Sequence, residues 1–591
     1  SNEVTVPNGF GSFNNVLTVE GGGGEAPVAI DFQFVHEGAL RFSSIPEDQE
    51  VLAFFNNRVI DVVRDQDGLS IAIPADAQEW ERAWIRLYTA RNGQQGGDWL
   101  IPLKYGEVVI DTKELDRKDW HTSIMYFAMV DRFFNGNPEN DQPVQDSTVH
   151  PRANYQGGDI EGMRQKLADG YFDALHTNTL WISPITQNPE DAWGLWNQGG
   201  PISTFSGYHG YWPISNTKPD HRFATPEELH LFLNDAHAKE QNVLLDYVAN
   251  HVHELHPVYQ KHPNWATNKY TADGRLNTQL WDEERLTTWF DTFMPTLELR
   301  NDTVADLMSD SALVWITEYD FDGFRHDATK HIPMNFTRLL TEKIRAASDD
   351  HVYQIGETYG SDELIASYVG SGKVDAQFNF NLYDAAFEAF TQEGATFDRL
   401  RKALESSLTY YGHHHLMGNI SGNQDKPRFS SMASGHLSMS EDSKLAGWTR
   451  EIPEPTERGY RKMAAMHAFN IAVPGIPILY YGDEIALHGG NDPDNRKMMP
   501  FDFSPRQQQL FDRIARLNEN RTNIMALNYG STTIHQPEPH LLIIVRKYME
   551  QEVRFFFNNS NEDRYLEEWD ITVPADGEIY QTRNCGQFNQ D

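Results

Sequence analysis

Two carboxyl groups, Asp327 and Glu357, stand at the ends of short apolar runs in this sequence. Residues 321–324 precede the aspartate and residues 351–355 precede the glutamate, and each run is typical of a buried strand. The spacing of about thirty residues matches one strand–helix–strand repeat, which places both groups at the carboxyl ends of neighbouring parallel strands. Two carboxyl groups that face one cavity, one ionised and one protonated, are what cleavage of a glycosidic bond requires.

The composition is that of a large, acidic, globular protein. The chain has 591 residues, which predicts two to four domains, and 39% of the residues are apolar and 12% aromatic. Asp and Glu total 86 against 49 Lys and Arg, and the net charge of −37 disfavours nucleic acid and anionic membranes as partners. A neutral or cationic partner is therefore expected.

Cysteine usage and the first residues bear on the compartment. Cys585 is the single cysteine, so neither an intrachain disulfide nor a cysteine-based metal site can form. No apolar run reaches the roughly eighteen residues that a membrane-spanning helix needs, so we expect no transmembrane segment. Residues 1–4 lack the basic and apolar regions of a signal peptide, so the chain is either cytoplasmic or numbered after signal removal. We favour a periplasmic or secreted protein.

The elements that must position the two carboxyl groups lie in residues 116–526. Apolar strand-like runs alternate there with helical patterns, which predicts an α/β fold, a (β/α)8 TIM barrel whose chemistry sits at the carboxyl ends of the strands. The runs are 124–130, 179–182, 243–245, 323–324, 352–355, 376–380, 416–420 and 476–481. Residues of about 252–301, rich in Trp, His, Asn and Asp, predict an inserted subdomain after strand 3, over the active face. An amphipathic helix near 504–520 closes the barrel.

Segments rich in β-structure flank the barrel on both sides. Residues 1–115 predict an N-terminal β-sandwich, with alternating runs such as 29–35 and 84–88. Residues 527–591 predict a small C-terminal β domain, with runs at 541–545 and 553–557. The N-terminal module would either bind carbohydrate through Trp80, Trp84 or Trp99, or serve in packing or as the contact of a homodimer. We favour the packing or dimer role.

Eight sequence blocks, in order along the chain, resemble the signature regions of the α-amylase superfamily, glycoside hydrolase family 13. They are LWISP (180–184), YHGYW (208–212), DYVANH (246–251), GFRHD (323–327), YQIGET (353–358), GNQD (422–425), GIPILYYGDE (475–484) and DPDNR (492–496). The resemblance covers about residues 120–525. A β module before the barrel makes the chain most similar to the neopullulanase- and cyclomaltodextrinase-like α-amylases.

The resemblance implies roles for three carboxyl groups. Asp327 would be the nucleophile that forms a covalent glycosyl-enzyme, Glu357 the acid and then the base, and Asp425 the group that holds the hydroxyls of the distorted sugar. Arg325, two residues before Asp327 on a strand, faces the same way, and its cation would keep Asp327 ionised. Nearby negative charge and partial burial would raise the pKa of Glu357, as an acid working near neutral pH needs.

Further residues in or beside these blocks correspond to family residues that contact substrate. Those at the cleavage subsite are His209, Tyr211, His251, Arg325, Gln424, Asp492 and Arg496, and those on the leaving-group side are Lys330 and His331. The family usually has His where this chain has Gln424, which can donate and accept hydrogen bonds but cannot carry charge, so the pH optimum and subsite affinity are expected to differ. Segment 294–298 (MPTLE) resembles the block ending the insert only loosely, whereas Ala328 resembles the α-1,4-acting members.

Oxygen-bearing side chains crowd the loop after the first predicted strand. They are Asp131, Asn135, Asn137, Asn140 and Asp141, and Gly158 and Asp159 follow. Dense oxygen donors suit Ca²⁺, which takes about six to eight oxygen ligands, and similar loops bind calcium in neopullulanases and cyclomaltodextrinases. The alternative is an Asx-rich turn that binds no metal. We expect a structural calcium ion.

Three functions are compatible with these motifs. The leading one is a retaining hydrolase of α-1,4-glucosidic bonds in starch-derived oligosaccharides, cyclodextrins or related α-glucans. The second is an α-glucan transglycosylase on the same fold, in which an acceptor sugar competes with water. The third is a non-catalytic glucan-binding protein, and the intact Asp327, Glu357 and Asp425 argue against it.

Overall fold

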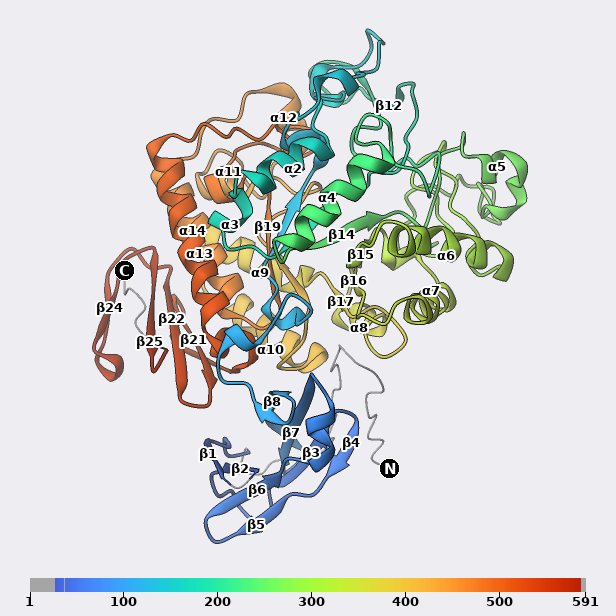
Figure 1. The fold of residues 1–591 in the computed structure, drawn as a ribbon. Helices are drawn as coiled ribbons and strands as arrows, with labels where there is room; N and C mark the ends of the chain where they lie inside the picture. Colours follow the sequence, from blue (N-terminus) through green and yellow to red (C-terminus); the bar gives the residue numbers. More distant parts are fainter. Residues whose placement is uncertain (1–26, 37, 586–591) are drawn as a thin grey trace.

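A closed barrel of parallel strands lies at the centre of the molecule in the computed structural model, which describes residues 27–36 and 38–585 (Figure 1). The strands are β10 (Met125–Ala128), β11 (Thr179–Ile182), β14 (Asn242–Tyr247), β15 (Gly323–His326), β16 (Tyr353–Gly356), β17 (Ala376–Gln377), β18 (Gly418–Ile420) and β19 (Ile476–Tyr480). Their hydrogen-bonded order is β17-β16-β15-β14-β11-β10-β19-β18. A parallel bridge between Phe378 and Gly418 closes the circle, so the predicted TIM barrel is confirmed.

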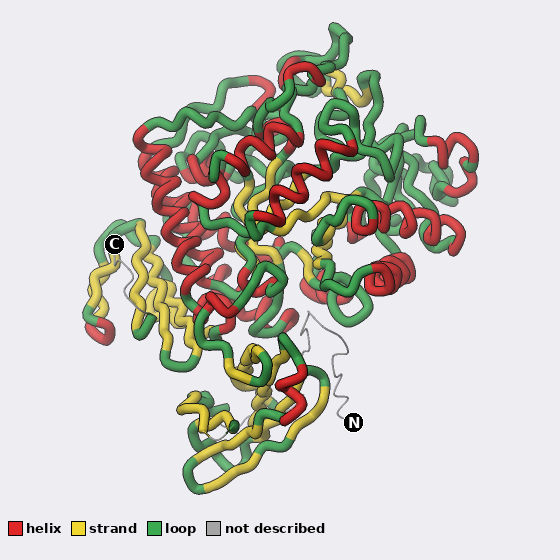
Figure 2. The backbone as a smooth tube through the Cα atoms, viewed as in Figure 1, coloured by secondary structure: helices red, strands yellow, loops and turns green. Residues whose placement is uncertain are grey.

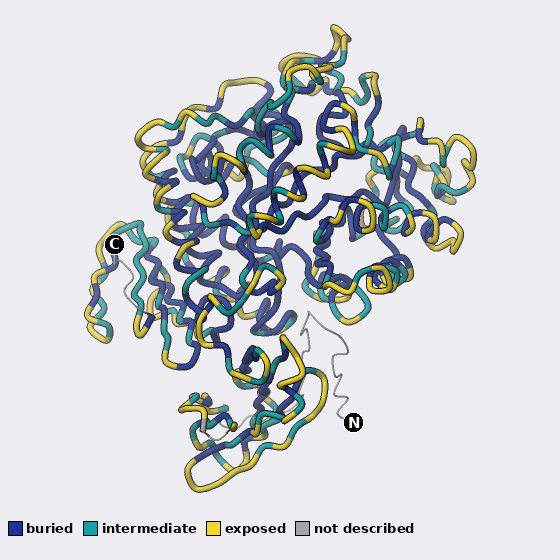
Figure 3. Tube along the Cα trace, viewed as in Figure 1, coloured by how far each residue is buried: buried dark blue, intermediate teal, exposed yellow. Residues whose placement is uncertain are grey.

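The barrel strands are short and buried on both faces. Every residue of β14, β15 and β16 is buried, which is why these strands appear in the sequence as continuous apolar runs rather than alternating ones. The interior is so crowded that a Cβ atom on Gly418 would lie 2.7 Å from the Cδ1 atoms of Ile355 and Ile478. Figure 3 shows the buried backbone concentrated along these strands, with exposed segments at the outer turns.

Helices surround the barrel (Figure 2). They are α1 (Val130–Phe133), α2 (Ile160–Ala168), α3 (Tyr171–Ala174), α4 (Pro226–Ala238), α5 (Pro257–Lys261), α6 (Asp302–Thr317), α7 (Met334–Ala347), α8 (Asp362–Ser367), α9 (Phe380–Thr391), α10 (Asp398–Tyr411), α11 (Phe429–Ala433), α12 (Ser443–Thr449), α13 (Glu457–Ala472), α14 (Pro505–Asn523) and α15 (Met525–Tyr529). The helix predicted near 504–520 is α14, which begins with a capping box between Ser504 and Gln507.

The expected insert follows β14 and has little regular structure. It contains only the short α5 and a single 3-10 turn, Pro263–Trp265, and otherwise consists of irregular backbone joined by isolated bridges such as His251 to Thr296. A second excursion, the hairpin of β12 (Trp193–Trp196) and β13 (Ser203–Phe205), follows β11. Both excursions leave the barrel at the carboxyl ends of strands.

The N-terminal module consists of two antiparallel sheets. One contains β1 (Phe32–His36), β2 (Ala39–Phe42), β6 (Gly68–Ala72) and β5 (Val63–Asp65), and the other β4 (Arg58–Ile60), β3 (Glu50–Phe55), β7 (Ala83–Arg91), β8 (Gln94–Lys104) and β9 (Glu107–Val108). Phe42 and Trp99 from the two sheets pack edge-to-face at 5.7 Å. Trp99 is therefore a core residue of the module. Residues 1–26 of the predicted module lie outside the described residues.

The module attaches to the end of the barrel that is opposite to the carboxyl ends of the strands. Asp98 on β8 is buried and lies 2.8 Å from Nε2 of His414 and 3.1 Å from Nη2 of Arg86. His414 lies four residues before the start of β18, so this contact is made at the amino end of a barrel strand. Figure 1 shows the module below the barrel.

A C-terminal sheet follows α15. Its strands are β20 (Ser531–Glu538), β21 (Leu541–Tyr548), β22 (Gln551–Asn558) and β25 (Gly577–Arg583), all antiparallel, with a separate pair of β23 (Arg564–Leu566) and β24 (Ile571–Val573). Phe557 packs on Phe390 of α9 and Phe469 of α13. Residues 586–591 of the predicted domain lie outside the described residues. In the part of the chain described, no helix is long and apolar enough to span a membrane.

The last residue of block 475–484 is a buried carboxyl group that is held by two tyrosine hydroxyls. Glu484, after β19, is fully buried and accepts hydrogen bonds from the hydroxyls of Tyr126, at 2.6 Å, and Tyr171. Burial raises the pKa of Glu484 to about 7, and the two tyrosine hydrogen bonds oppose that rise. The Glu484 side chain therefore stays protonated to a higher pH than an exposed glutamate does.

Candidate active site

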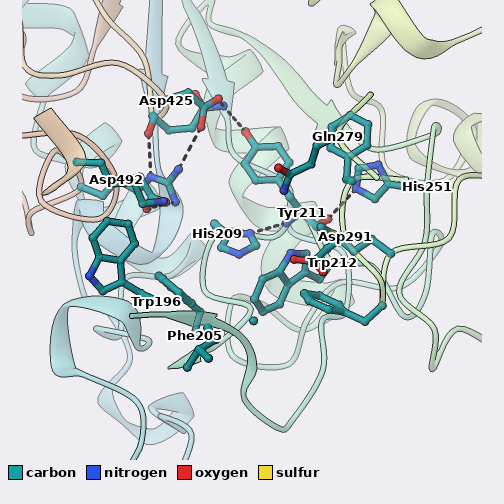
Figure 4. Close-up of a pocket in the computed structure, with 18 of the residues that line it drawn as sticks. Trp196, Phe205, His209, Tyr211, Trp212, His251, Gln279, Asp291, Asp425 and Asp492 are labelled. Atoms are coloured by element: carbon teal, nitrogen blue, oxygen red, sulfur yellow. Dashed lines mark hydrogen bonds and ion pairs between the residues drawn. The ribbon is translucent and has the colours of Figure 1, made fainter. Parts of the chain in front are cut away.

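A pocket of about 600 Å³ opens at the carboxyl ends of the barrel strands (Figure 4). Nine of the predicted site residues line it: His209, Tyr211, His251, Asp327, Glu357, Gln424, Asp425, Asp492 and Arg496. They follow different strands, and only the closed barrel brings their ends to one place. The module, as far as it is described (27–36 and 38–115), contributes no lining residue.

Arg325 contacts the two candidate catalytic carboxyl groups at once. Its Nη1 donates to Oδ1 of Asp327 and to Oδ1 of Asp246, both at 2.8 Å, and its Nη2 lies 2.9 Å from Oε2 of Glu357. Asp246 on β14 is the register partner of Arg325 on β15, and Asp327 faces the same way because it lies two residues further along. One buried cation therefore holds three carboxyl groups around it.

These carboxyl groups share a single positive charge, so burial dominates their titration. Burial raises the pKa of Asp327 and of Glu357, while Arg325 opposes the rise at both. Arg325 thus favours the ionised Asp327, as expected, but does not outweigh its burial. Burial also raises the pKa of Asp246 to about 7, and the charge of Asp327 adds to that rise. The pKa of Glu357 is thus shifted in the direction that an acid catalyst requires.

Gln424 links Asp425 to the opposite wall of the pocket. Its Nε2 donates to Oδ2 of Asp425 and to the hydroxyl oxygen of Tyr211, both at 3.0 Å, and that hydroxyl donates to Oδ2 of Asp246 at 2.8 Å. Gln424 is 1% exposed, and its Oε1 has no hydrogen-bond partner within residues 27–36 and 38–585. Gln424 lines the pocket, so its amide is a candidate to contact a bound molecule, and its buried Oε1 is a polar atom that no described side chain satisfies.

His209 and His251 hold Tyr211 in place. The backbone N–H of Tyr211 donates to Nδ1 of His209 at 3.0 Å, and Nε2 of His251 donates to the Tyr211 carbonyl at 3.1 Å. The His209 and Tyr211 rings are nearly parallel, with centroids 5.8 Å apart. Burial lowers the pKa of His209 to about 3 and of His251 to about 4, so both position the tyrosine as neutral side chains.

Asp492 and Arg496 form an ion pair beside Asp425. Oδ1 of Asp492 lies 2.9 Å from Nη1 of Arg496, and Nη2 of Arg496 lies 3.2 Å from Oδ1 of Asp425. The neighbouring cations hold the pKa of Asp492 at about 2 despite its burial. Asp492 is therefore a permanent anion in the pocket wall.

Lys330 and His331 do not line this pocket. Lys330 Nζ lies 2.6 Å from Oδ1 of Asp282, and Nδ1 of His331 donates to the carbonyl of Arg285 at 2.7 Å. Asp282 and Arg285 both belong to the insert. The two residues predicted on the leaving-group side are thus at the junction between the barrel and the insert.

The sequence matches the model of the α-amylase catalytic domain over residues 127–526. This chain belongs to the α-amylase family of glycoside hydrolases.

It is 26% identical over 471 residues to a cyclomaltodextrin glucanotransferase of Bacillus sp. (strain 17-1), covering 74% of this chain and 59% of that protein. It is 26% identical over 460 residues to a cyclomaltodextrinase of Geobacillus thermopakistaniensis, covering 75% and 70%. The crystal structure of an Anoxybacillus α-amylase superposes with a TM-score of 0.64 at 26% identity, covering 78% of this chain and 96% of that one. The resemblance identified in the sequence is confirmed.

The predicted calcium loop of this α-amylase-family protein lies after β10. Nδ2 of Asn135 donates to both oxygens of Asp141, at 3.0 and 2.8 Å, and Nδ2 of Asn140 donates to Oδ2 of Asp159 at 3.2 Å. The Oδ1 atoms of Asn135 and Asn140 are buried without a partner in the described part of the chain. Unpaired amide oxygens beside two carboxylates are the donor type that Ca²⁺ prefers. No cluster of three or more His, Cys, Asp or Glu suited to a metal occurs in residues 27–36 and 38–585.

The remaining predicted metal ligands, Asp131, Asn137 and Gly158, make contacts within the same loop, and the N–H of Asn137 donates to Oδ2 of Asp159 at 2.9 Å. Asp131 pairs with Nε of Arg132 at 2.7 Å and accepts the N–H of Gln156 at 3.0 Å. The N–H of Gly158 donates to the Asp131 carbonyl at 3.0 Å, whereas its neighbour Gly157 lies directly against Asn135 and Asp141. Asn137 accepts the N–H of Glu139.

Several residues that line the pocket were not predicted from the sequence. They are Trp196, Phe205, Gln279, Phe290, Asp291, Asp442 and Lys444, among others. They come from the hairpin after β11, from the insert and from the start of α12, all outside the matched blocks. The abundance of Trp and Phe near glycines in residues 193–205 was a signal for the hairpin, but nothing in the sequence points to Lys444.

Proposed function

We propose that this protein is a retaining hydrolase of α-1,4-glucosidic bonds in starch-derived oligosaccharides, cyclodextrins or related α-glucans. Membership of the α-amylase family supports hydrolysis or transfer of α-glucans in general. The more specific proposal, a retaining hydrolase of α-1,4 bonds, is based on the geometry of the pocket. Its main support is the position of Arg325 between Asp327 and Glu357, with Asp425 on the same pocket.

In the proposed mechanism the two carboxyl groups divide the work. Asp327 attacks the anomeric carbon while Glu357 donates a proton to the departing glycosidic oxygen, so the C–O bond breaks as the glycosyl-enzyme forms. Glu357, now ionised, takes a proton from water, and the water oxygen displaces Asp327 from the anomeric carbon. Arg325 stabilises the carboxylate that is charged at each stage, because it contacts both groups.

The remaining polar residues would orient the reacting sugar. Asp425 accepts hydrogen bonds from its hydroxyls, and the unpaired Oε1 of Gln424 accepts another. The Tyr211 ring, fixed by its hydrogen bond to Asp246 and by the neighbouring histidines, offers a flat surface for the sugar ring. Interactions that strengthen as the sugar distorts lower the barrier rather than only tightening binding.

Transglycosylation is the second candidate. It is favoured by the relatives named cyclomaltodextrin glucanotransferase, although this chain covers only 59% of the length of the one described above. The same glycosyl-enzyme serves both reactions, and the acceptor decides between them. No polar contact described above distinguishes water from a sugar hydroxyl as acceptor.

Product analysis tests both candidates. The enzyme is incubated with maltoheptaose, β-cyclodextrin, pullulan and starch, and the anomeric configuration of the first product is followed by NMR. We expect shorter α-anomeric maltooligosaccharides. Products longer than the substrate would identify a transglycosylase, β-anomeric products would exclude the retaining mechanism, and no products would exclude both candidates.

We also propose that the loop after β10 binds a structural Ca²⁺. Asn135, Asn140, Asp141 and Asp159 would supply oxygens, and the two unpaired amide oxygens support this choice. Asp131 is not included because its carboxylate already pairs with Arg132. A homodimer through the N-terminal module and a location outside the cytoplasm stay predictions.

A further inference from the structure

One wall of the pocket carries charges of alternating sign. Asp425 contacts Arg496 at 3.2 Å, Arg496 contacts Asp492 at 2.9 Å, and Oδ2 of Asp492 contacts Nζ of Lys444 at 3.0 Å. All four side chains line the pocket. Lys444 ends the row and is its most solvent-accessible cation, with 36% of its side chain exposed against 7% for Arg496.

Lys444 lies beside two aromatic rings of the hairpin. Its Nζ is 5.7 Å from the centre of the Trp196 ring and 6.0 Å from that of Phe205, and both rings line the pocket. The lysine stands in the first turn of α12, whose N-cap is Asp442. Trp196 in turn stacks on Trp448 of α12, with ring centroids 5.6 Å apart. Helix and hairpin thus present a cation and two rings to the same space.

This wall is held by contacts of its own, separate from the barrel core. Trp196 and Trp448 belong to a small apolar cluster distinct from the main one. The hairpin approaches the helix so closely that a Cβ atom on Gly200 would lie 2.5 Å from the Trp448 carbonyl. The N–H of Asn491 donates to the carbonyl of Ser443 at 3.0 Å, which attaches the start of α12 to the loop that carries Asp492. Lys444 is therefore positioned before any ligand arrives.

The wall lies on the side of the pocket away from the expected leaving group. Figure 4 shows Trp196 and Phe205 on one side and His251 with Gln279 on the other. Phe290 packs against His251 at 4.7 Å and against His331 at 5.2 Å, so the second side continues toward the residues assigned to the leaving group. The row of charges leads from Asp425 in the opposite direction.

We propose that Lys444, Trp196 and Phe205 form an additional glucose-binding subsite that retains the far end of an α-glucan chain. The inference rests on the proposed function. The ammonium group has three donors, and among the described residues only Asp492 accepts from it, so two donors are available to sugar hydroxyls. The two rings offer apolar surface to the C–H faces of the same sugar. Because Asp492 offsets its charge, the subsite suits a neutral ligand.

The test varies only the part of the substrate that reaches this wall. The substrates are nitrophenyl α-maltooligosides with one to five glucose units. When nitrophenol is released directly, the nitrophenyl group occupies the leaving-group position. The glucose chain then extends from the cleaved bond toward Lys444, and its length increases along the series. We expect Lys444→Met to lower kcat/KM about tenfold on the longest chain and less than about twofold on the shortest. Phe205→Leu should show the same dependence on length. Lys239→Ala is the matched control, because Lys239 pairs with Asp173 at 2.6 Å and its side chain is 33% exposed.

Two kinetic outcomes would overturn the subsite. An equal loss at all chain lengths would mean that Lys444 acts through Asp492, and no loss at any length would mean that the chain does not reach it. A second measurement does not need turnover. It compares the affinity for maltoheptaose of the Glu357→Gln enzyme with that of the Glu357→Gln, Lys444→Met double variant. We expect about tenfold weaker binding, and equal affinities would reject the subsite. A wild-type enzyme that binds maltoheptaose but releases no nitrophenol and cleaves no glucan would reject the proposed function instead.

Discussion

Gln424 offers the sharpest test of how the site holds its substrate. Its amide donates to Asp425 and to Tyr211, and its Oε1 is buried without a partner. Gln424→Ala removes both donors and the acceptor while leaving the carboxyl groups around Arg325 in place. The variant therefore addresses binding of the reacting sugar rather than the acid–base chemistry.

The expected magnitude follows from the hydrogen bonds that are lost. A hydrogen bond to a charged group contributes about 1.5–3 kcal/mol and one to a neutral group about 1 kcal/mol. Water entering the space left by the side chain recovers part of this. We therefore expect a loss of about 1–3 kcal/mol in transition-state stabilisation, or roughly 5- to 150-fold in kcat/KM.

The assay is steady-state kinetics on one maltooligosaccharide across pH, with melting curves to check the fold. Gln508→Ala is the matched control, because Gln508 also donates to an aspartate, Asp512 at 2.8 Å, but on the exposed surface of α14. We expect this control to equal wild type. Gln424→His should keep the reaction and its stereochemistry, and the new imidazole beside Asp425 should alter the pH profile near neutrality.

One result would refute this reasoning. If Gln424→Ala matched wild type within about twofold at every pH, the unpaired Oε1 would not meet a substrate hydroxyl. The correspondence between segment 422–425 and the family's block would then have to be redrawn.

Three further outcomes are expected. Asp327→Asn and Glu357→Gln should each lower kcat by several orders of magnitude with little change in melting temperature; more than roughly a tenth of wild-type activity, a factor worth only about 1.4 kcal/mol, would contradict their roles. A chelator should lower the melting temperature and added Ca²⁺ should restore it, since a metal that binds only the folded state stabilises it; an unchanged curve with no metal by elemental analysis would remove the calcium proposal. Burial raises the pKa of Glu484 from 4.5 to about 7, so the stability it contributes is complete below about pH 4.5 and falls as pH rises toward 7. Glu484→Gln should therefore flatten the decline in melting temperature between about pH 4.5 and 7, and an unaltered slope would mean that other groups cause it.

The barrel and the order of its catalytic blocks were predictable from the sequence alone. Runs such as 323–324 and 352–355 are apolar without alternation because a parallel barrel strand is buried on both faces. Asp327 and Glu357 follow such runs, and the carboxyl ends of adjacent parallel strands meet at one face, so their proximity follows from local pattern. The start of α14 could also be predicted from the sequence, because Ser504 and Gln507 form a capping box within one turn.

Only the tertiary structure decided which side chains complete the site. Lys444 meets Asp492, and Trp196 stacks on Trp448, because a hairpin and a helix from distant parts of the chain pack on each other. The spacing of apolar residues within the hairpin or within the helix does not indicate that the two segments contact each other. The structure likewise pairs the carboxylate of Asp131 with the guanidinium of Arg132 as well as with the N–H of Gln156 in the predicted metal loop. Periodicity and capping depend on residues a few positions apart and can be read locally, whereas contacts between loops depend on how whole elements pack, and no local pattern encodes that.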